Sequence, residues 1–192
     1  MVRLSNLYRT LAMRGLMLLL LFLPVLSFGS ESDKQFIEET KVEADQGNAE
    51  ARYWLGGMYD LGIGAPKDDK EAVKWYRLAA DQGHAKAQFN LGVMYAYGRG
   101  VPKDEKEAVK WFRLAADQWN AEAQYWLGGM YGKGQGVPKD NVLAYMWVNI
   151  AGANGHDVEK LREILTGLMS QADIAKAQEK TTQYIKDHPD VY

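Results

Sequence analysis

The sequence predicts an all-α fold built from a repeated pair of helices, and three observations carry that prediction. The pattern Ala-x-Ala-x-aromatic-x-Leu-Gly-x-Met-Tyr begins at Ala49, Ala85 and Ala121, each time 36 residues after the last. A pair of glycines follows each of these segments, and a second apolar segment follows each pair. A fixed period of about 20–50 residues is typical of solenoids, in which each unit buries its apolar face against its neighbours.

Residues 1–29 have the features of a secretory signal peptide. Its first 15 residues contain three arginines and no acidic residue. Residues 16–26 are apolar, and small residues stand at positions 27 and 29. The apolar run is shorter than the ~18–20 residues that cross a bilayer, and Pro24 interrupts it. We therefore expect cleavage after Gly29 and a protein exported to a bacterial periplasm or secreted. An uncleaved membrane anchor is the alternative.

Charge and cysteine content exclude several classes of function. Without residues 1–29 the chain has 20 basic and 25 acidic residues, a net charge of −5 that gives no electrostatic reason to bind nucleic acid. The chain has no cysteine, which excludes a disulfide framework and a lipid-modified cysteine anchor. We expect neither nucleic acid nor, after cleavage, a membrane as a partner.

Each unit divides into a first helix, a glycine turn and a second helix. The residues before the three first helices are Asn48, His84 and Asn120, of which asparagine is a good N-cap. The glycines after each helix are expected to supply the positive φ angles that end it, and they are Gly62 and Gly64, Gly98 and Gly100, and Gly134 and Gly136. We expect one leucine in each first helix to be buried, and the glycine after it to let a neighbouring helix approach closely. These are Leu55, Leu91 and Leu127, followed by Gly56, Gly92 and Gly128.

The second helices follow a proline in each turn and show the apolar periodicity of packed helices over residues 72–79 and 108–115. Their predicted N-caps are Asp68, Asp104 and Asp140. Glu71 and Glu107 stand three residues after their cap, which is the spacing of a capping box.

The two ends of the array differ from its middle. Residues 30–48 match the second half of a unit and are interpreted as an N-terminal capping half repeat. Three full repeats, 49–84, 85–120 and 121–156, follow it. The second helix of the third repeat is apolar nearly all round, so it must be covered, and residues 157–192 are expected to supply C-terminal capping helices. Trp119 stands where the other units have Gly47, Gly83 and Gly155, which predicts a helix end that closes differently.

These motifs together resemble the Sel-one-like repeat, a branch of the tetratricopeptide-like helical repeats. The resemblance rests on the repeated first-helix pattern, on Gly-x-Gly-Val-Pro-Lys-Asp and on Ala-Val-Lys-Trp-Phe/Tyr-Arg-Leu-Ala-Ala-Asp-Gln, and it covers residues 34 to about 180. The segment 169–178 is also similar to the tail of exported bacterial members. The resemblance implies a right-handed α-α superhelical solenoid of helix-turn-helix repeats that serves as a non-catalytic scaffold for protein–protein contacts, with no cofactor.

A candidate binding surface follows from helix geometry. At about 100° per residue, positions 2, 6, 9 and 13 of each first helix share one face, and these positions differ between units while their neighbours are nearly identical. We call these residues the variable stripe. They are Glu50, Trp54, Gly57 and Leu61; Lys86, Asn90, Val93 and Tyr97; and Glu122, Trp126, Gly129 and Lys133. Variation indicates freedom from packing, and large aromatic residues there are typical anchors for a partner. The alternative is that these side chains fold onto adjacent helices as peripheral core.

Catalysis and metal binding have little support in the sequence. The three histidines lack metal-ligand spacing, the acidic pairs are explained by helix capping, and no nucleophile motif is present. We therefore expect a non-enzymatic protein that binds a peptide or partner helix in a concave groove. Two alternatives remain: a structural subunit of an envelope complex held by its ends, and a protein that binds cell-wall glycan or peptide through the stripe.

Overall fold

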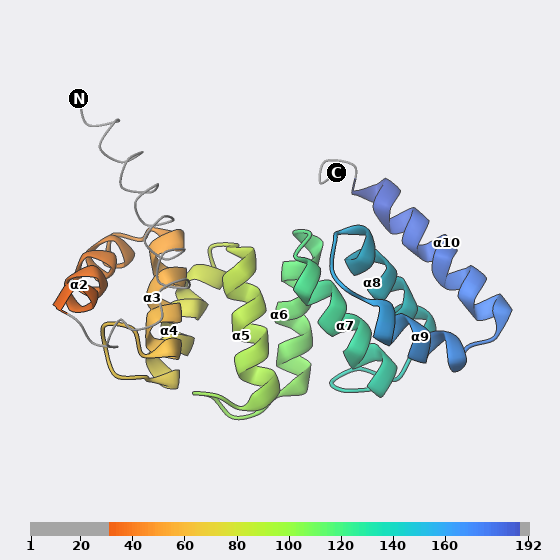
Figure 1. The fold of residues 1–192 in the computed structure, drawn as a ribbon, viewed down its shortest axis with the longest axis horizontal. Helices are drawn as coiled ribbons and strands as arrows, with labels where there is room; N and C mark the ends of the chain where they lie inside the picture. The colour runs from red at the N-terminus through yellow and green to blue at the C-terminus, as the bar shows by residue number, and fades with distance from the viewer. Residues whose placement is uncertain (1–30, 189–192) are drawn as a thin grey trace.

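The computed structural model describes residues 31–188, so the predicted signal peptide lies outside the described residues. Within that range the chain forms nine α-helices, which confirms the predicted all-α solenoid of helix-turn-helix repeats (Figure 1). They are α2 (Glu31–Asp45), α3 (Ala49–Leu61), α4 (Asp69–Ala80), α5 (Ala85–Tyr97), α6 (Glu105–Asp117), α7 (Ala121–Lys133), α8 (Asn141–Ala153), α9 (Glu159–Gly167) and α10 (Gln171–Asp187).

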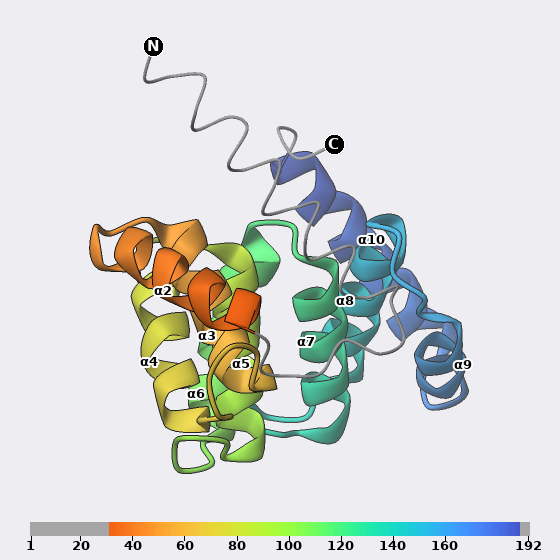
Figure 2. The same ribbon diagram turned by 60° about the vertical axis from the view of Figure 1, so that its left-hand side comes forward.

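Each helix from α2 to α9 packs mainly on the helix before and after it, and the stack runs along the long axis of the molecule (Figure 1). The exception is α10, which turns back and lies along α8. In Figure 2, α4 and α8 lie on the outer side of the arc relative to α3 and α7. The first helices of the first and third repeats, α3 and α7, thus lie on the inner side in this view.

The helices begin and end as their sequence predicts. The side chains of Asn48, His84 and Asn120 each accept a hydrogen bond from a backbone N–H in the first turn of α3, α5 and α7. A glycine in the left-handed region ends each of these helices, at φ angles of 74°, 70° and 73°.

Asp68, Asp104 and Asp140 cap the second helices, as predicted. The glutamates of the expected capping boxes bind elsewhere: Glu71 pairs with Lys74 at 3.1 Å and Glu107 with Lys110 at 2.7 Å, each one turn further along the helix.

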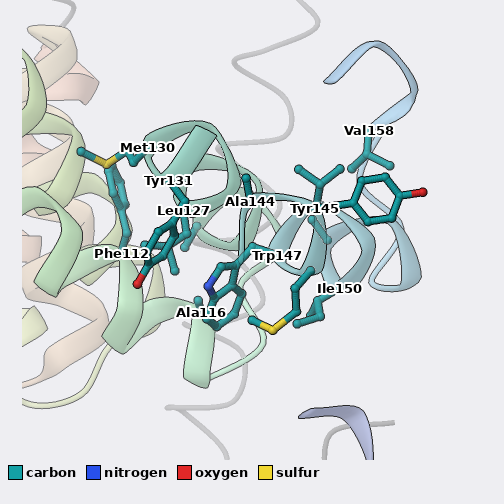
Figure 3. Packing of buried hydrophobic residues seen from close by; sticks show 14 of the residues in the cluster. Phe112, Ala116, Leu127, Met130, Tyr131, Ala144, Tyr145, Trp147, Ile150 and Val158 are labelled. Atoms are coloured by element: carbon teal, nitrogen blue, oxygen red, sulfur yellow. The ribbon is translucent and has the colours of Figure 1, made fainter. Parts of the chain in front are cut away.

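The core runs through the array between first and second helices. Leu55, Leu91 and Leu127 are fully buried, as expected. A Cβ on Gly92 would lie 2.7 Å from the ring of Phe112, so the close approach predicted at this glycine is confirmed. Figure 3 shows the largest part of the core, in which residues of α6, α7 and α8 interdigitate.

Two contacts between repeats were not predicted. Arg99, in the α5–α6 turn, pairs with Asp60 and, at 3.1 Å, with Asp69 in the preceding repeat. The backbone of this turn also packs closely against Asp69, since a Cβ on Gly100 would lie 2.1 Å from the carbonyl oxygen of Asp69. The turn of one repeat is thereby locked onto the first turn of the second helix before it.

A ladder of buried amides also links the units. Gln88 Nε2 donates to the carbonyl of Ala80 at 3.1 Å, and Gln124 Nε2 donates to that of Ala116 at 3.2 Å. The exposed Gln118 donates from Nε2 to the side-chain oxygen Oε1 of Gln88 at 2.7 Å, within the second repeat. Buried polar groups need such partners, and the carbonyls of Ala80 and Ala116 each belong to the repeat before their glutamine.

The apolar α8 is covered, as expected, by the C-terminal helices. Val158, Leu165, Ile174 and Ala177 are buried against its cluster. Thr181 Oγ1 on α10 lies 3.5 Å from the carbonyl oxygen of Met146, which places α10 along α8.

The prediction for Trp119 was wrong, because this helix end closes as the others do. Trp119 N and Asn120 N donate to the carbonyls of Ala116 and Ala115, at 2.9 and 3.0 Å. Gly83 and His84 make the equivalent bonds after α4. Trp119 therefore adopts the left-handed backbone conformation of the glycines, at φ 63°, and is the one residue other than glycine within residues 31–188 to have a positive φ.

Candidate functional site

The variable stripe lies on α3, α5 and α7, the first helices of the three repeats. Its most exposed large apolar residues are Leu61 and Tyr97, at 60% and 63% exposure, and both occupy the last position of their helix. The corresponding residue in the third repeat is the exposed Lys133. The C-terminal end of the stripe is therefore apolar in two repeats and cationic in the third.

Trp126 is less free than the sequence suggested. It is half-buried, and its ring packs 5.4 Å from that of Phe112 and 6.4 Å from that of Phe89, so it forms part of the core edge. Its other neighbour is Tyr97, whose ring meets it edge-on at 5.8 Å. Val93 is also half-buried against the same cluster. Trp126 and Tyr97 thus form a continuous aromatic surface across the junction between repeats 2 and 3, buried at one end and exposed at the other.

Trp54 is held by a polar cluster at the junction of repeats 1 and 2. Its Nε1–H donates to Glu50 Oε1 at 2.9 Å, and its ring lies 5.1 Å from that of Tyr53. The second oxygen of Glu50 lies 3.1 Å from Nε2 of His84, and the His84 ring stacks on Tyr53 at 4.7 Å. One carboxylate therefore fixes both the half-buried tryptophan and the N-cap of α5.

Tyr53 also belongs to this cluster, although it is not part of the variable stripe. Burial raises the pKa of its hydroxyl, and the charges of Glu50 and then Glu122 add to the rise. Glu122 is a residue of α7, so this charge acts on Tyr53 from the third repeat, an effect that the spacing of the repeats does not signal.

The remaining stripe residues are polar or charged. Asn90 is half-buried and hydrogen-bonds the hydroxyl of Tyr76, whose pKa is raised by burial and by Asp60 and lowered by that bond. Lys86, Glu122 and Lys133 are exposed, and within residues 31–188 they form no ion pair. Their charges are thus available at the rim of the stripe.

A second surface lies at the C-terminal end of the array. A shallow cleft of about 340 Å³ separates the start of α8 from the α9–α10 turn, lined by Lys139, Asp140, Asn141, Val142, Leu168, Met169 and Asp173. Leu168 and Ile164, one turn apart on α9 and its C-cap, are 60% and 53% exposed. This end of the solenoid carries an apolar patch that is separate from the stripe.

Within residues 31–188 no group of three or more potential ligands is arranged to hold a metal ion. The same part of the chain has no helix both long and apolar enough to cross a membrane.

Comparison with known proteins identifies the repeats. The Sel1 repeat model matches residues 49–84, 85–118 and 121–156, together more than half of the chain. The chain is similar to the crystal structure of a Sel1 repeat protein from Oxalobacter formigenes, with 39% sequence identity and a TM-score of 0.61 over 64% of this chain and 49% of that one.

It is also similar to the crystal structure of a protective antigen present in uropathogenic Escherichia coli strains, which displays an SLR fold. That similarity has 30% identity and a TM-score of 0.62 over 81% of this chain and 42% of that one. The chain thus matches half or less of the length of these two proteins, and no curated protein matches it. Its repeats, and the match across all three of them, make it a member of the Sel1 repeat family, whose repeats are typically scaffolds for protein interaction.

Proposed function

We propose that this protein is a non-catalytic scaffold that binds a peptide or partner helix along the variable stripe, in the concave groove formed by α3, α5 and α7. The observation that carries the proposal is the pair Leu61 and Tyr97. Both are large, both are about three-fifths exposed, and both occupy the same position of consecutive first helices. A soluble protein has no packing reason to place such residues in register on one face.

Trp126 and Trp54 extend this surface with ordered aromatic rings. Since Trp126 is held against Phe112 and Trp54 against Glu50, their positions are set before a partner arrives. Such preorganisation lowers the entropy that binding costs. The unpaired charges of Lys86, Glu122 and Lys133 lie at the rim, where charge mainly selects partners and alters association rates.

Site-specific photocrosslinking tests this assignment. A photoreactive residue in place of Tyr97 should capture a partner in cells that make the protein. One in place of Leu114, which is 47% exposed on α6, is the matched control and should capture little. Adducts at position 114 but not at 97 would place the partner on the outer side and refute the groove.

The anchors are then tested by truncation. Tyr97→Ala and Trp54→Ala should weaken binding of the captured partner by about 2 kcal/mol or more, as is typical of aromatic anchors. Trp126→Ala is a less clean test than its sequence position suggests, because loss of the ring also opens the core edge beside Phe112.

A second candidate function is that of a structural subunit held by its ends. The observation that favours it is the exposed pair Ile164 and Leu168 beside the C-terminal cleft. Crosslinks from position 168 alone would support this alternative.

We further propose that the protein acts outside the cytoplasm, in a bacterial periplasm or secreted. The support is the basic, apolar and small-residue order of residues 1–29. The mass of the mature protein should correspond to a chain that starts at Ser30.

A further inference from the structure

The three first helices have the same kind of N-cap, but one of the caps can be protonated. Asn48 Oδ1 accepts from Ala51 N at 3.1 Å, and Asn120 Oδ1 accepts from Ala123 N at 2.7 Å. In the middle repeat His84 Nδ1 does the same for Ala87 N, at 3.2 Å. An asparagine cap is independent of pH, whereas an imidazole nitrogen accepts a hydrogen bond only while it carries no proton.

The hydrogen bonds fix the tautomer of His84. Since Nδ1 accepts from Ala87 N, the proton of the neutral ring is on Nε2. Nε2 then donates to Glu50 Oε2, at 3.1 Å, and Glu50 Oε1 accepts from Trp54. Neutral His84 therefore connects the first turn of α5 to the Glu50–Trp54 pair on α3.

We propose that His84 is a pH-sensitive N-cap, which holds the start of α5 while neutral and releases it when protonated. A second proton on the ring occupies Nδ1, so the Ala87 N–H loses its acceptor. It also places a positive charge at the N-terminus of α5, where the unpaired N–H groups of the helix disfavour cations.

The neighbouring charges decide the sign of the effect. Glu50 and Tyr53 on α3 contact the His84 ring, and Asp81 and Lys86 are the charged residues closest to it in the sequence. Glu122 on α7 acts on Tyr53. Among residues 31–188 only Glu50 makes an ion pair with His84. The Glu50 side chain is 52% exposed, so water screens the attraction that protonation would add. Lys86 adds a like charge two residues away. Loss of the cap hydrogen bond and a positive charge at the helix terminus both oppose protonation, and only a screened ion pair favours it, so the proposal predicts that stability falls on acidification.

Protonation of the His84 cap would also affect binding at the stripe, and only this effect on binding rests on the proposed function. Protonated His84 keeps its Nε2–H bond to Glu50, so loss of the Nδ1 cap loosens the start of α5 beside the Glu50–Trp54 pair, which lies at one end of the stripe. Acidification then loosens the stripe at the junction of repeats 1 and 2, while the junction of repeats 2 and 3, capped by Asn120, stays unchanged.

Thermal unfolding of the purified protein at pH 8 and pH 5 tests the cap, with His84→Asn as the matched control because asparagine is the natural cap of the other two repeats. Wild-type Tm should fall between the two pH values by about 2–4 °C more than the Tm of His84→Asn. Equal falls in the two proteins would overturn the proposal.

Glu50→Gln separates the cap from the ion pair. Glutamine keeps an acceptor for His84 and Trp54 but removes the compensating charge, so the loss of Tm at pH 5 should persist and grow. A Glu50→Gln protein without pH dependence would show that the ion pair is the sensor, and would overturn the proposal.

Amide hydrogen exchange supplies a local measurement that needs no global unfolding. The exchange rate of the Ala87 amide relative to the Ala123 amide should rise about fivefold from pH 8 to pH 5 in the wild type and stay constant in His84→Asn. A constant ratio in the wild type would refute the switch. None of these measurements involves a partner, so their outcome and that of the crosslinking experiment are independent.

Discussion

The second and third repeats have the same pair of helices, yet their second helices have different surroundings. In the second repeat Lys110 is largely exposed on α6 and pairs with Glu107. At the equivalent position of α8, Met146 is buried under the C-terminal helices, and α10 lies where α6 has solvent. Residues that contact the neighbouring repeats, such as Leu91 and Leu127, are identical and equally buried.

This difference shows which residues define the repeat and which define its place in the array. Contacts between first and second helices recur in every unit, so they require the same residues. The outer side of the second helix has different neighbours in different repeats. It is charged where it faces solvent, as in α6, and apolar where α10 covers it, as in α8. Variation at a buried position such as Met146 therefore reflects the end of the array, whereas variation at exposed positions has no packing cause and fits the proposed binding surface.

The largest expected loss of stability comes from truncating the buried leucines that the two repeats share. Leu91→Ala and Leu127→Ala should each lower the free energy of unfolding by about 2–5 kcal/mol, because both side chains are fully buried and their truncation leaves a cavity. Chemical denaturation measures it. A variant at either position that unfolds like the parent would show that the repeats do not share this core.

The second-largest expected effect concerns the equivalent positions 110 and 146, at which the two repeats differ. Met146→Lys gives α8 the residue of α6 and should cost about 2–4 kcal/mol, because it places a charge under α10 at a site only 8% exposed. The reciprocal Lys110→Met, on the exposed side of α6, should change stability by no more than about 0.5 kcal/mol. Similar losses for the two variants would mean that α10 does not cover α8 in solution.

The sequence was sufficient for the architecture because its signals are local and repeated three times. Asn48 and Asp104 cap their helices, and Gly92 allows close approach, for reasons that a helix start or a helix crossing imposes anywhere. The contacts of Arg99 with Asp60 and Asp69 could not be found this way, because they depend on where a turn meets the preceding repeat.

The candidate site was predictable only in part. Periodicity placed the stripe on one face of the first helices, but it could not separate exposed Tyr97 from half-buried Trp126, since both stand on that face. Their difference comes from Phe112 in the neighbouring helix, which fills the space beneath Trp126. The connection from Trp54 through Glu50 to His84 likewise joins two repeats, and no period within one repeat reveals it.

The smallest expected effect concerns Trp119, which distinguishes the end of the second repeat from the equivalent glycines. Its left-handed backbone costs about 1–2 kcal/mol relative to glycine. Its ring stacks on Tyr184 of α10 at 6.0 Å and an interplanar angle of 10°. Tyr184 is anchored there by a hydrogen bond of 3.1 Å to Asp117, and burial followed by that carboxylate raises the pKa of its hydroxyl.

We therefore expect the strain at Trp119 to be offset by the contact that holds α10. Trp119→Gly relieves the backbone and removes the ring, so global stability should change by less than about 1 kcal/mol while amide exchange in α10 becomes faster. Trp119→Ala removes the ring but keeps the strained φ, and should be less stable than Trp119→Gly by about 1–2 kcal/mol. In a Tyr184→Ala background the stacking is already lost, so Trp119→Gly should become stabilising there. If Trp119→Gly instead stabilises the parent protein and leaves exchange in α10 unchanged, the tryptophan does not fasten the C-terminal helix, and the third repeat is covered by α8–α10 packing alone.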